Sequence, residues 1–228
     1  MVADTQGQSE GDSKMSNPVI DSVRSSLARN AHNAESPDSM RPGIYPARQP
    51  GSIDSEIEQF LDEVKKLSGS AQKLDAKTVI DALKTITKEQ GIRKATVWDS
   101  PGLNKLGICG HLRDLGVELI SPNADKHEMA LCDLGVTEAD YLLPETGTLV
   151  LRSSNEKPRG VSLLPRIHLA IVSPAMLRAD LHQVFAEARD SHYLVFVTGP
   201  SRTADIELTV TLGVHGPKNL YVWMMDQD

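Results

Sequence analysis

Residues 193–207 read Tyr-Leu-Val-Phe-Val-Thr-Gly-Pro-Ser-Arg-Thr-Ala-Asp-Ile-Glu, and Gly-Val-His-Gly-Pro follows at 213–217. The first five residues form an apolar run that is typical of a buried strand, which we expect over 193–198. The turn after this strand concentrates hydroxyl groups, one arginine and two carboxylates. Burying so many polar groups beside an apolar strand costs free energy unless they bind one another or a ligand. The stretch therefore predicts both a strand end and a candidate site.

Strands and helices alternate over most of the remaining chain. Apolar runs predict strands, and apolar residues at helical spacing predict helices. The predicted strands are 95–98, 117–120, 147–152, 167–172, 193–198 and 220–225, and the predicted helices are 53–67, 79–91, 103–115 and 176–189. Strands separated by helices, with few hairpin signals, favour an α/β fold whose sheet is largely parallel.

The N-terminal part differs in composition. Residues 1–16 are rich in Ser, Gly, Gln and Asp and hold little that a core could bury, which is typical of disorder. An Asn-Pro pair at 17–18 predicts the start of a short helix at about 18–30. Residues 31–51 hold four of the chain's 13 prolines and predict an extended linker. We expect a disordered segment, 1–51, that carries this helix, followed by a single α/β domain over 52–228.

Charge and composition exclude several classes of protein. A formal net charge of -7, without a basic stripe, argues against nucleic-acid binding. The longest apolar runs span about five residues, whereas a membrane helix needs roughly 20, so we expect no membrane span. The acidic N-terminus does not resemble a secretory signal, and we expect a cytoplasmic protein. The histidines and the isolated Cys109 and Cys132 lack the spacing of a metal site, so we expect no metal in this chain.

The turn after residue 197 has the composition of an anion site. Ligands of open parallel sheets gather beyond the carboxyl ends of the strands, and we expect 198–207 to lie at such an end. Gly199 lets the chain turn and expose its amides. Ser201 and Thr203 suit the cap of a following helix, whose N-terminus attracts anions. Arg202 adds a planar donor for a carboxylate or phosphate.

Two carboxylates in the same turn, Asp205 and Glu207, repel an anion unless an arginine neutralises them. The alternative is a capped helix with an internal Arg–Asp pair, and the sequence leaves both interpretations open. The residues that we predict to bind a small anionic ligand are Thr146, Gly147, Thr148, Gly199, Pro200, Ser201, Arg202, Thr203, Asp205, Glu207 and Gly216.

Glu145 and His215 are the candidate catalytic residues. Glu145 follows Pro144 and leads through Gly147 into a predicted strand, on a tight connection where a carboxylate can act as nucleophile or general base if its surroundings tune its pKa. The alternative is a turn glutamate that pairs with Arg152 or caps nearby amides. His215 lies between glycines and can shuttle protons near neutral pH, or it satisfies backbone groups of the turn. His168 lies within a predicted strand, and we expect a hydrogen-bonded core residue there.

These motifs together resemble the lactate utilization protein C family. The likeness covers roughly residues 90–228, although this chain has Pro144 where the family usually has a small residue. The motifs that carry it are Ala139-Asp140, Glu-Thr-Gly-Thr-Leu-Val-Leu at 145–151, Ser-Leu-Leu-Pro at 162–165, Thr-Gly-Pro-Ser-Arg-Thr-Ala-Asp-Ile-Glu at 198–207 and Gly-Val-His-Gly-Pro at 213–217.

The resemblance implies a three-layer α/β fold with a mostly parallel sheet, similar to the ribose-5-phosphate isomerase, glucosamine-6-phosphate deaminase and CoA-transferase group. It also implies a role as subunit or accessory factor in oxidising L-lactate to pyruvate. Two iron–sulfur sister proteins would be the partners, and this chain would carry no cofactor. The alternative is a stand-alone enzyme of the CoA-transferase or sugar-phosphate isomerase type, with Glu145 as nucleophile or base and an anion site at 199–203. Whether the chain is catalytic is left open.

Overall fold

The computed structural model describes residues 19, 21–22, 25, 48–191, 193–204, 210–212 and 215–225. The chain divides into two units, Met1–Pro46 and Ala47–Asp228, and each is described by itself. In the first unit the described residues are helical and fall inside the helix predicted at 18–30: Val19, Asp21, Ser22 and Ser25. The other residues of that helix, the predicted disordered stretch and the predicted linker up to residue 47 lie outside the described residues.

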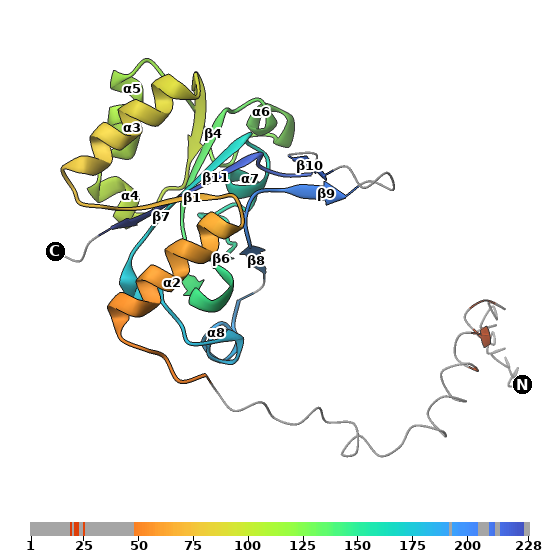
Figure 1. Cartoon of the computed structure of the whole chain (residues 1–228). Helices are drawn as coiled ribbons and strands as arrows, with labels where there is room; N and C mark the ends of the chain where they lie inside the picture. The colour runs from red at the N-terminus through yellow and green to blue at the C-terminus, as the bar shows by residue number, and fades with distance from the viewer. Residues whose placement is uncertain are drawn as a thin grey trace, which may run out of the picture. The chain divides into compact units, whose positions relative to one another are not determined.

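A parallel sheet forms the centre of the second unit (Figure 1). Its strands, in spatial order, are β1 (Ser70–Leu74), β11 (Asn219–Met225), β7 (Ile167–Val172), β4 (Leu134–Glu138), β2 (Lys94–Val97) and β3 (Glu118–Ile120). All five neighbouring pairs are parallel. Every residue of β7 is buried, as expected for a strand that is covered on both faces of the sheet.

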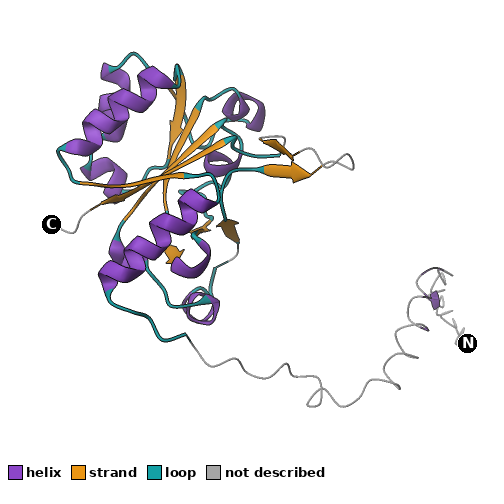
Figure 2. Ribbon diagram, in the orientation of Figure 1, coloured by secondary structure: helices purple, strands orange, loops and turns teal. Residues whose placement is uncertain are grey.

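Helices cover both faces of this sheet (Figure 2). They are α2 (Ile53–Lys66), α3 (Thr78–Glu89), α4 (Pro101–Lys105), α5 (Ile108–Asp114), α6 (Lys126–Ala130), α7 (Gly160–Leu163) and α8 (Leu181–Glu187), with 3₁₀ turns η1 (Pro144–Thr146) and η2 (Pro174–Met176). Helices α3, α4 and α5 lie together on one side of the sheet, and α2 lies on the other (Figure 1). The predicted three-layer α/β fold is therefore confirmed.

Helix α2 forms because its local sequence and its packing agree. The side chain of Ser52 accepts the N–H of Ser55 at 3.3 Å and caps the N-terminus. The buried residues recur at helical spacing, at Ile57, Phe60, Leu61 and Val64. The helix predicted over 53–67 is thus confirmed to within a residue.

Two strands that were predicted correctly belong to a different sheet from the one expected. A separate three-stranded antiparallel sheet contains β5 (Tyr141–Leu143), β6 (Thr148–Arg152) and β8 (Leu194–Val197). The strands predicted over 147–152 and 193–198 are its members β6 and β8. A further antiparallel pair, β9 (Arg202–Ala204) and β10 (Val210–Leu212), projects from the body (Figure 1).

Two predicted helices are shorter than expected. The helix predicted over 103–115 is divided into α4 and α5, because Gly107 takes a left-handed φ of 65° between them. The helix predicted over 176–189 is replaced by η2 and α8. Asp180 sets the start of α8, since its carboxylate accepts the N–H of Gln183 at 3.0 Å.

His168 confirms the prediction of a hydrogen-bonded core histidine. It lies in β7 with none of its surface exposed, and its Nε2 is 2.8 Å from Oγ1 of Thr137 on β4. Its Nδ1 has no hydrogen-bond partner among the described residues. Because burial disfavours the charged imidazolium, the pKa of His168 falls from 6.5 to about 4.

The free energy of unfolding should therefore decrease as the pH falls from about 6.5 to about 4. In this window the unfolded histidine binds a proton that the folded one does not, so acid favours unfolding. We expect His168→Gln to have a shallower slope of unfolding free energy against pH, measured by urea denaturation. His127→Gln, at an exposed position of α6, is the matched control and should keep the original slope. Superimposable slopes for both variants and the original protein would contradict this origin of acid sensitivity.

Candidate functional site

Glu145 lies in η1, the turn that joins β5 to β6. Its side chain is 59% exposed, and its Oε1 lies 3.2 Å from Nε of Arg48. The alternative partner considered from the sequence, Arg152, instead binds Asp140 with an Nε–Oδ1 distance of 3.2 Å. Glu145 thus pairs with an arginine from the stretch that was predicted to be a linker.

Arg48 is the centre of a charged cluster at the start of α2. Its Nη1 and Nη2 donate to the two carboxylate oxygens of Glu56 at 2.7 and 3.0 Å, and Nη2 also donates to Gln59 at 3.0 Å. The N–H of Gly51 adds a bond of 2.7 Å to the same carboxylate. Hydrogen bonds from Arg48 are the main reason that the pKa of Glu56 lies below its ordinary value. The cluster fixes Glu145 against α2.

Gly147 brings the same turn into contact with the backbone of α2. It has a left-handed φ of 58°. A Cβ atom at this position would lie 2.7 Å from the backbone nitrogen of Val64 and 2.9 Å from the carbonyl carbon of Glu63. Both the backbone conformation and the close approach require glycine.

A chain of hydroxyl groups joins the two sequence motifs. Oγ1 of Thr146 lies 2.7 Å from Oγ1 of Thr148, which lies 2.8 Å from Oγ1 of Thr198. The antiparallel pairing of β6 with β8 produces this arrangement, since it aligns Leu149 with Val197. The structure therefore brings the glutamate motif and the start of the arginine motif together, although 50 residues separate them along the chain.

The arginine motif packs on the C-terminal end of α2. Gly199, with φ of 90°, lies where a Cβ would be 3.1 Å from Cβ of Leu67. Arg202 donates from Nη2 to the carbonyl oxygen of Leu67 and to Oγ of Ser68. A guanidinium at a helix C-terminus donates hydrogen bonds to carbonyl groups that have no partner within the helix. Its positive charge also interacts favourably with the negative end of the helix dipole.

The helix expected after Ser201 is absent from this position, because strand β9 begins at Arg202. Ser201 therefore does not cap a helix N-terminus, and the backbone of Thr203 belongs to β9. Instead the N–H of Ser201 donates to the carbonyl of Pro217 at 2.9 Å. This contact ties the buried Pro200 and its neighbours to the segment that precedes β11.

The arginine motif also lies at the opposite edge of the parallel sheet from the one expected. Leu67 and Ser68 precede β1, and Pro217 precedes β11, so the arginine motif lies at the amino-terminal edge. The prediction was wrong because β8 belongs to the antiparallel sheet. His215 is exposed at this edge, and a Cβ on Gly216 would lie 3.3 Å from Ser201.

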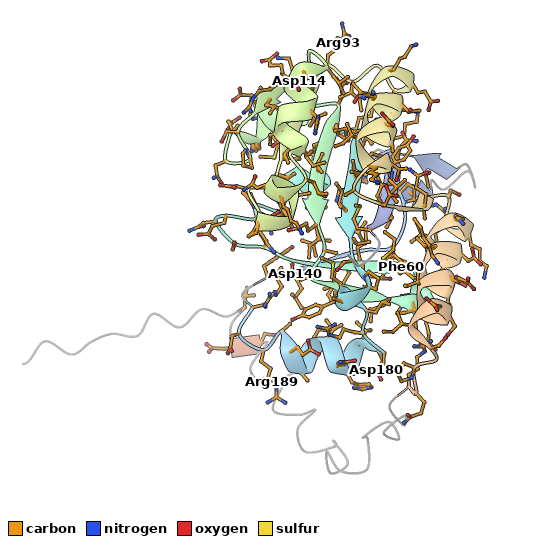
Figure 3. All side chains as sticks on the ribbon, turned by 90° about the vertical axis from the view of Figure 1, so that its left-hand side faces the viewer. Phe60, Arg93, Asp114, Asp140, Asp180 and Arg189 are labelled. Carbon is orange, nitrogen blue, oxygen red and sulfur yellow. The ribbon has the colours of Figure 1, made fainter. Side chains whose placement is uncertain are left out.

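Not every predicted site residue joins this arrangement. Asp205 and Glu207 lie outside the described residues. In the part of the chain that the structure describes, His215 makes no hydrogen bond or ion pair with Glu145. Glu145 instead lines a cavity of about 220 Å³ with Thr146, and with Asp180 and His182 at the start of α8. Figure 3 shows Asp180 and Arg189 at opposite ends of this helix.

A second cavity lies at the carboxyl edge of the parallel sheet, and sequence reasoning missed it. It has a volume of about 380 Å³ and is lined by residues at the ends of three strands: Glu138 of β4, Ile171 and Val172 of β7 and Met225 of β11. Lys105 of α4 lies at the same cavity. The available signal was the run Leu-Gly-Val-Thr-Glu at 134–138, a short strand ending in a carboxylate.

A parallel sheet covered by helices on both faces, with a cavity at its carboxyl edge, defines the class of open, layered α/β domains. Comparison with known proteins places the chain more narrowly. It belongs to the LUD domain family, whose model matches residues 57–225. In the part of the chain that the structure describes, none of the helices is both long and apolar enough to cross a membrane.

Relatives and a solved structure agree with this family. Lactate utilization protein C of Halalkalibacterium halodurans is 31% identical over 179 residues, which cover 73% of this chain and 77% of that protein. Lactate utilization protein C of a Geobacillus species is 28% identical over 194 residues, covering 77% and 80%. The crystal structure of a DUF162 family protein from Deinococcus radiodurans has the same fold, with a TM-score of 0.55, 19% identity and coverage of 77% and 99%. The resemblance identified from the motifs is confirmed.

Proposed function

We propose that this protein is a subunit or accessory factor of a cytoplasmic system that oxidises L-lactate to pyruvate. The observation that carries the proposal is its similarity to proteins named lactate utilization protein C, over 77% of the length of one of them. The match of the LUD domain model over residues 57–225 supports it.

In this proposal the electrons of the oxidation pass to an acceptor in partner proteins. Iron–sulfur clusters are commonly held by four cysteine thiolates, and these 228 residues contain two cysteines. Cys132 is buried, and burial raises its pKa from 9.0 to about 11, so it stays a thiol at neutral pH. Burial also raises the pKa of Cys109. The proposal therefore places the clusters in two partner proteins. It gives this chain the tasks of assembling with those partners and of binding a small anionic ligand.

Deletion of the gene tests this role in the cell. In a host without a second copy, the proposal predicts loss of growth on L-lactate as the carbon source and normal growth on pyruvate. Expression of the intact chain from a plasmid should restore growth on L-lactate. Undiminished growth of the clean deletion strain on L-lactate would refute the proposal.

We also propose a second function, a small-molecule activity of the chain itself at Glu145. Its support is the cavity that Glu145 shares with Thr146, Asp180 and His182. A sugar phosphate or CoA ester at about 100 times its Kd should stabilise the fold by roughly 2.7 kcal/mol, which thermal unfolding detects. Glu145→Gln should reduce that effect. Unchanged melting temperatures with all such compounds would leave the accessory role as the surviving function.

A further inference from the structure

We propose that the cavity at the carboxyl edge of the parallel sheet binds a flat heterocycle that has N–H donors on one edge and an anionic tail. Among the described residues, Glu138 is a carboxylate and Lys105 an ammonium without an ion-pair partner, and both line one cavity whose surface is partly apolar and partly polar. This site is separate from the Glu145 cavity and does not depend on the proposed role in lactate oxidation.

The position and size of the cavity are those of a small-molecule site. The ends of β4, β7 and β11 form one wall, and ligands of open parallel sheets bind beyond such ends. A volume of about 380 Å³ lies within the range of roughly 300–1,000 Å³ that is usual for ligand pockets. L-Lactate would fill only a small part of this space, so a larger molecule is the better match.

Glu138 supplies the recognition group. Its carboxylate lies directly against Gly102 of α4, where any Cβ atom would overlap Oε1. Among the residues that the structure describes, no hydrogen bond or ion pair satisfies this half-buried carboxylate. An ionised carboxylate accepts two parallel N–H bonds with favourable geometry. A heterocycle with an amidine-like edge, in which a ring N–H lies beside an exocyclic amino group, provides these donors.

The remaining lining determines the shape and charge of the ligand. The apolar part of the cavity lining comes from Ile171, Val172 and the thioethers of Met176 and Met225. Methionine sulfur packs favourably against aromatic rings, which suits a flat ligand. Lys105 is exposed and makes no ion pair with a described residue, so its ammonium is free to attract an anionic tail that extends towards solvent.

Binding of folate and GMP to the purified full chain, measured by isothermal titration calorimetry, tests the proposal. Each probe joins an N–H-bearing heterocycle to an anionic tail. We expect at least one to bind and Glu138→Gln to weaken its binding about tenfold or more, since a charge-assisted bond is lost. Lys105→Met should weaken the binding of GMP but leave the binding of guanosine, which lacks the phosphate, unchanged.

Two further variants separate binding from folding. Ala76→Trp narrows the cavity at an exposed position and should abolish binding without changing the melting temperature. Glu128→Gln, on α6 before the amino end of β4, is the matched control and should bind like the original protein. The proposal is overturned if neither folate nor GMP binds at millimolar concentration. It is equally overturned if a bound probe is insensitive to both Glu138→Gln and Ala76→Trp while these variants remain folded.

Discussion

Gly147→Ala should destabilise the protein by roughly 2–5 kcal/mol, the largest effect that we expect from a single methyl group in the candidate site. The left-handed backbone at this residue costs a residue with a Cβ about 1–2 kcal/mol. Contact of that Cβ with the backbone of α2 at Val64 adds about 1–3 kcal/mol of overpacking. Urea denaturation followed by circular dichroism measures the change.

Gly91→Ala is the matched control. Gly91 has nearly the same φ, 59°, but a Cβ there would have no atom within 4 Å. Only the backbone cost of about 1–2 kcal/mol should therefore appear. Equal losses of stability in the two variants would show that α2 does not crowd the turn that carries Glu145.

Arg48→Ala should cost roughly 2–4 kcal/mol, because it leaves the carboxylate of Glu56 without its bidentate partner. The side chain of Glu56 is 8% exposed and that of Arg48 is 17% exposed, so solvent replaces the lost bonds poorly. The cost should be at the lower end of the range for fully buried pairs, since Arg48 retains some contact with water. The free energy of unfolding at pH 7 measures it.

The loss should depend on pH in a defined direction. Because the pKa of Glu56 is lowered in the folded protein, its contribution is present above the ordinary carboxyl pKa of 4.5 and disappears as the pH falls through the folded pKa. The difference between Arg48→Ala and the original protein should thus shrink in acid. Lys66→Ala removes an exposed pair with Glu63 and should change the free energy of unfolding far less, because solvent screens that pair. If Arg48→Ala lowered the free energy of unfolding no more than Lys66→Ala does, the stabilising role of the Arg48 cluster would be contradicted.

The sequence predicted the elements whose signals are local. The apolar run at 167–172 and the amphipathic pattern at 53–67 specify β7 and α2 without reference to the rest of the chain. β1 was missed because Ser-Ala-Gln-Lys-Leu is a mostly polar strand at the edge of the sheet. β4 was missed because Gly135 interrupts its apolar run. The structure explains this glycine, since a Cβ at residue 135 would overlap the carbonyl oxygen of Val161 on α7.

The candidate site was predictable in its residues but not in its geometry. The motifs at 145–148 and 198–202 were recognised, and the structure joins them through Thr148 and Thr198. Their partners depend on pairing between distant segments. Nothing local indicates that Arg48 would bind Glu145, or that β8 would pair with β6 and direct Arg202 towards the C-terminus of α2. The Glu138 cavity likewise forms only when several strand ends meet.

Affinity purification of the full chain from its own host, grown on L-lactate, is the most direct test of the proposed function. The eluate is assayed for iron and for L-lactate-dependent reduction of a dye. We expect iron-bearing partner proteins to co-purify and the dye to be reduced only when L-lactate is added. Recovery of the chain alone, without iron and without L-lactate-dependent dye reduction, would contradict its assignment to an iron–sulfur lactate-oxidising system.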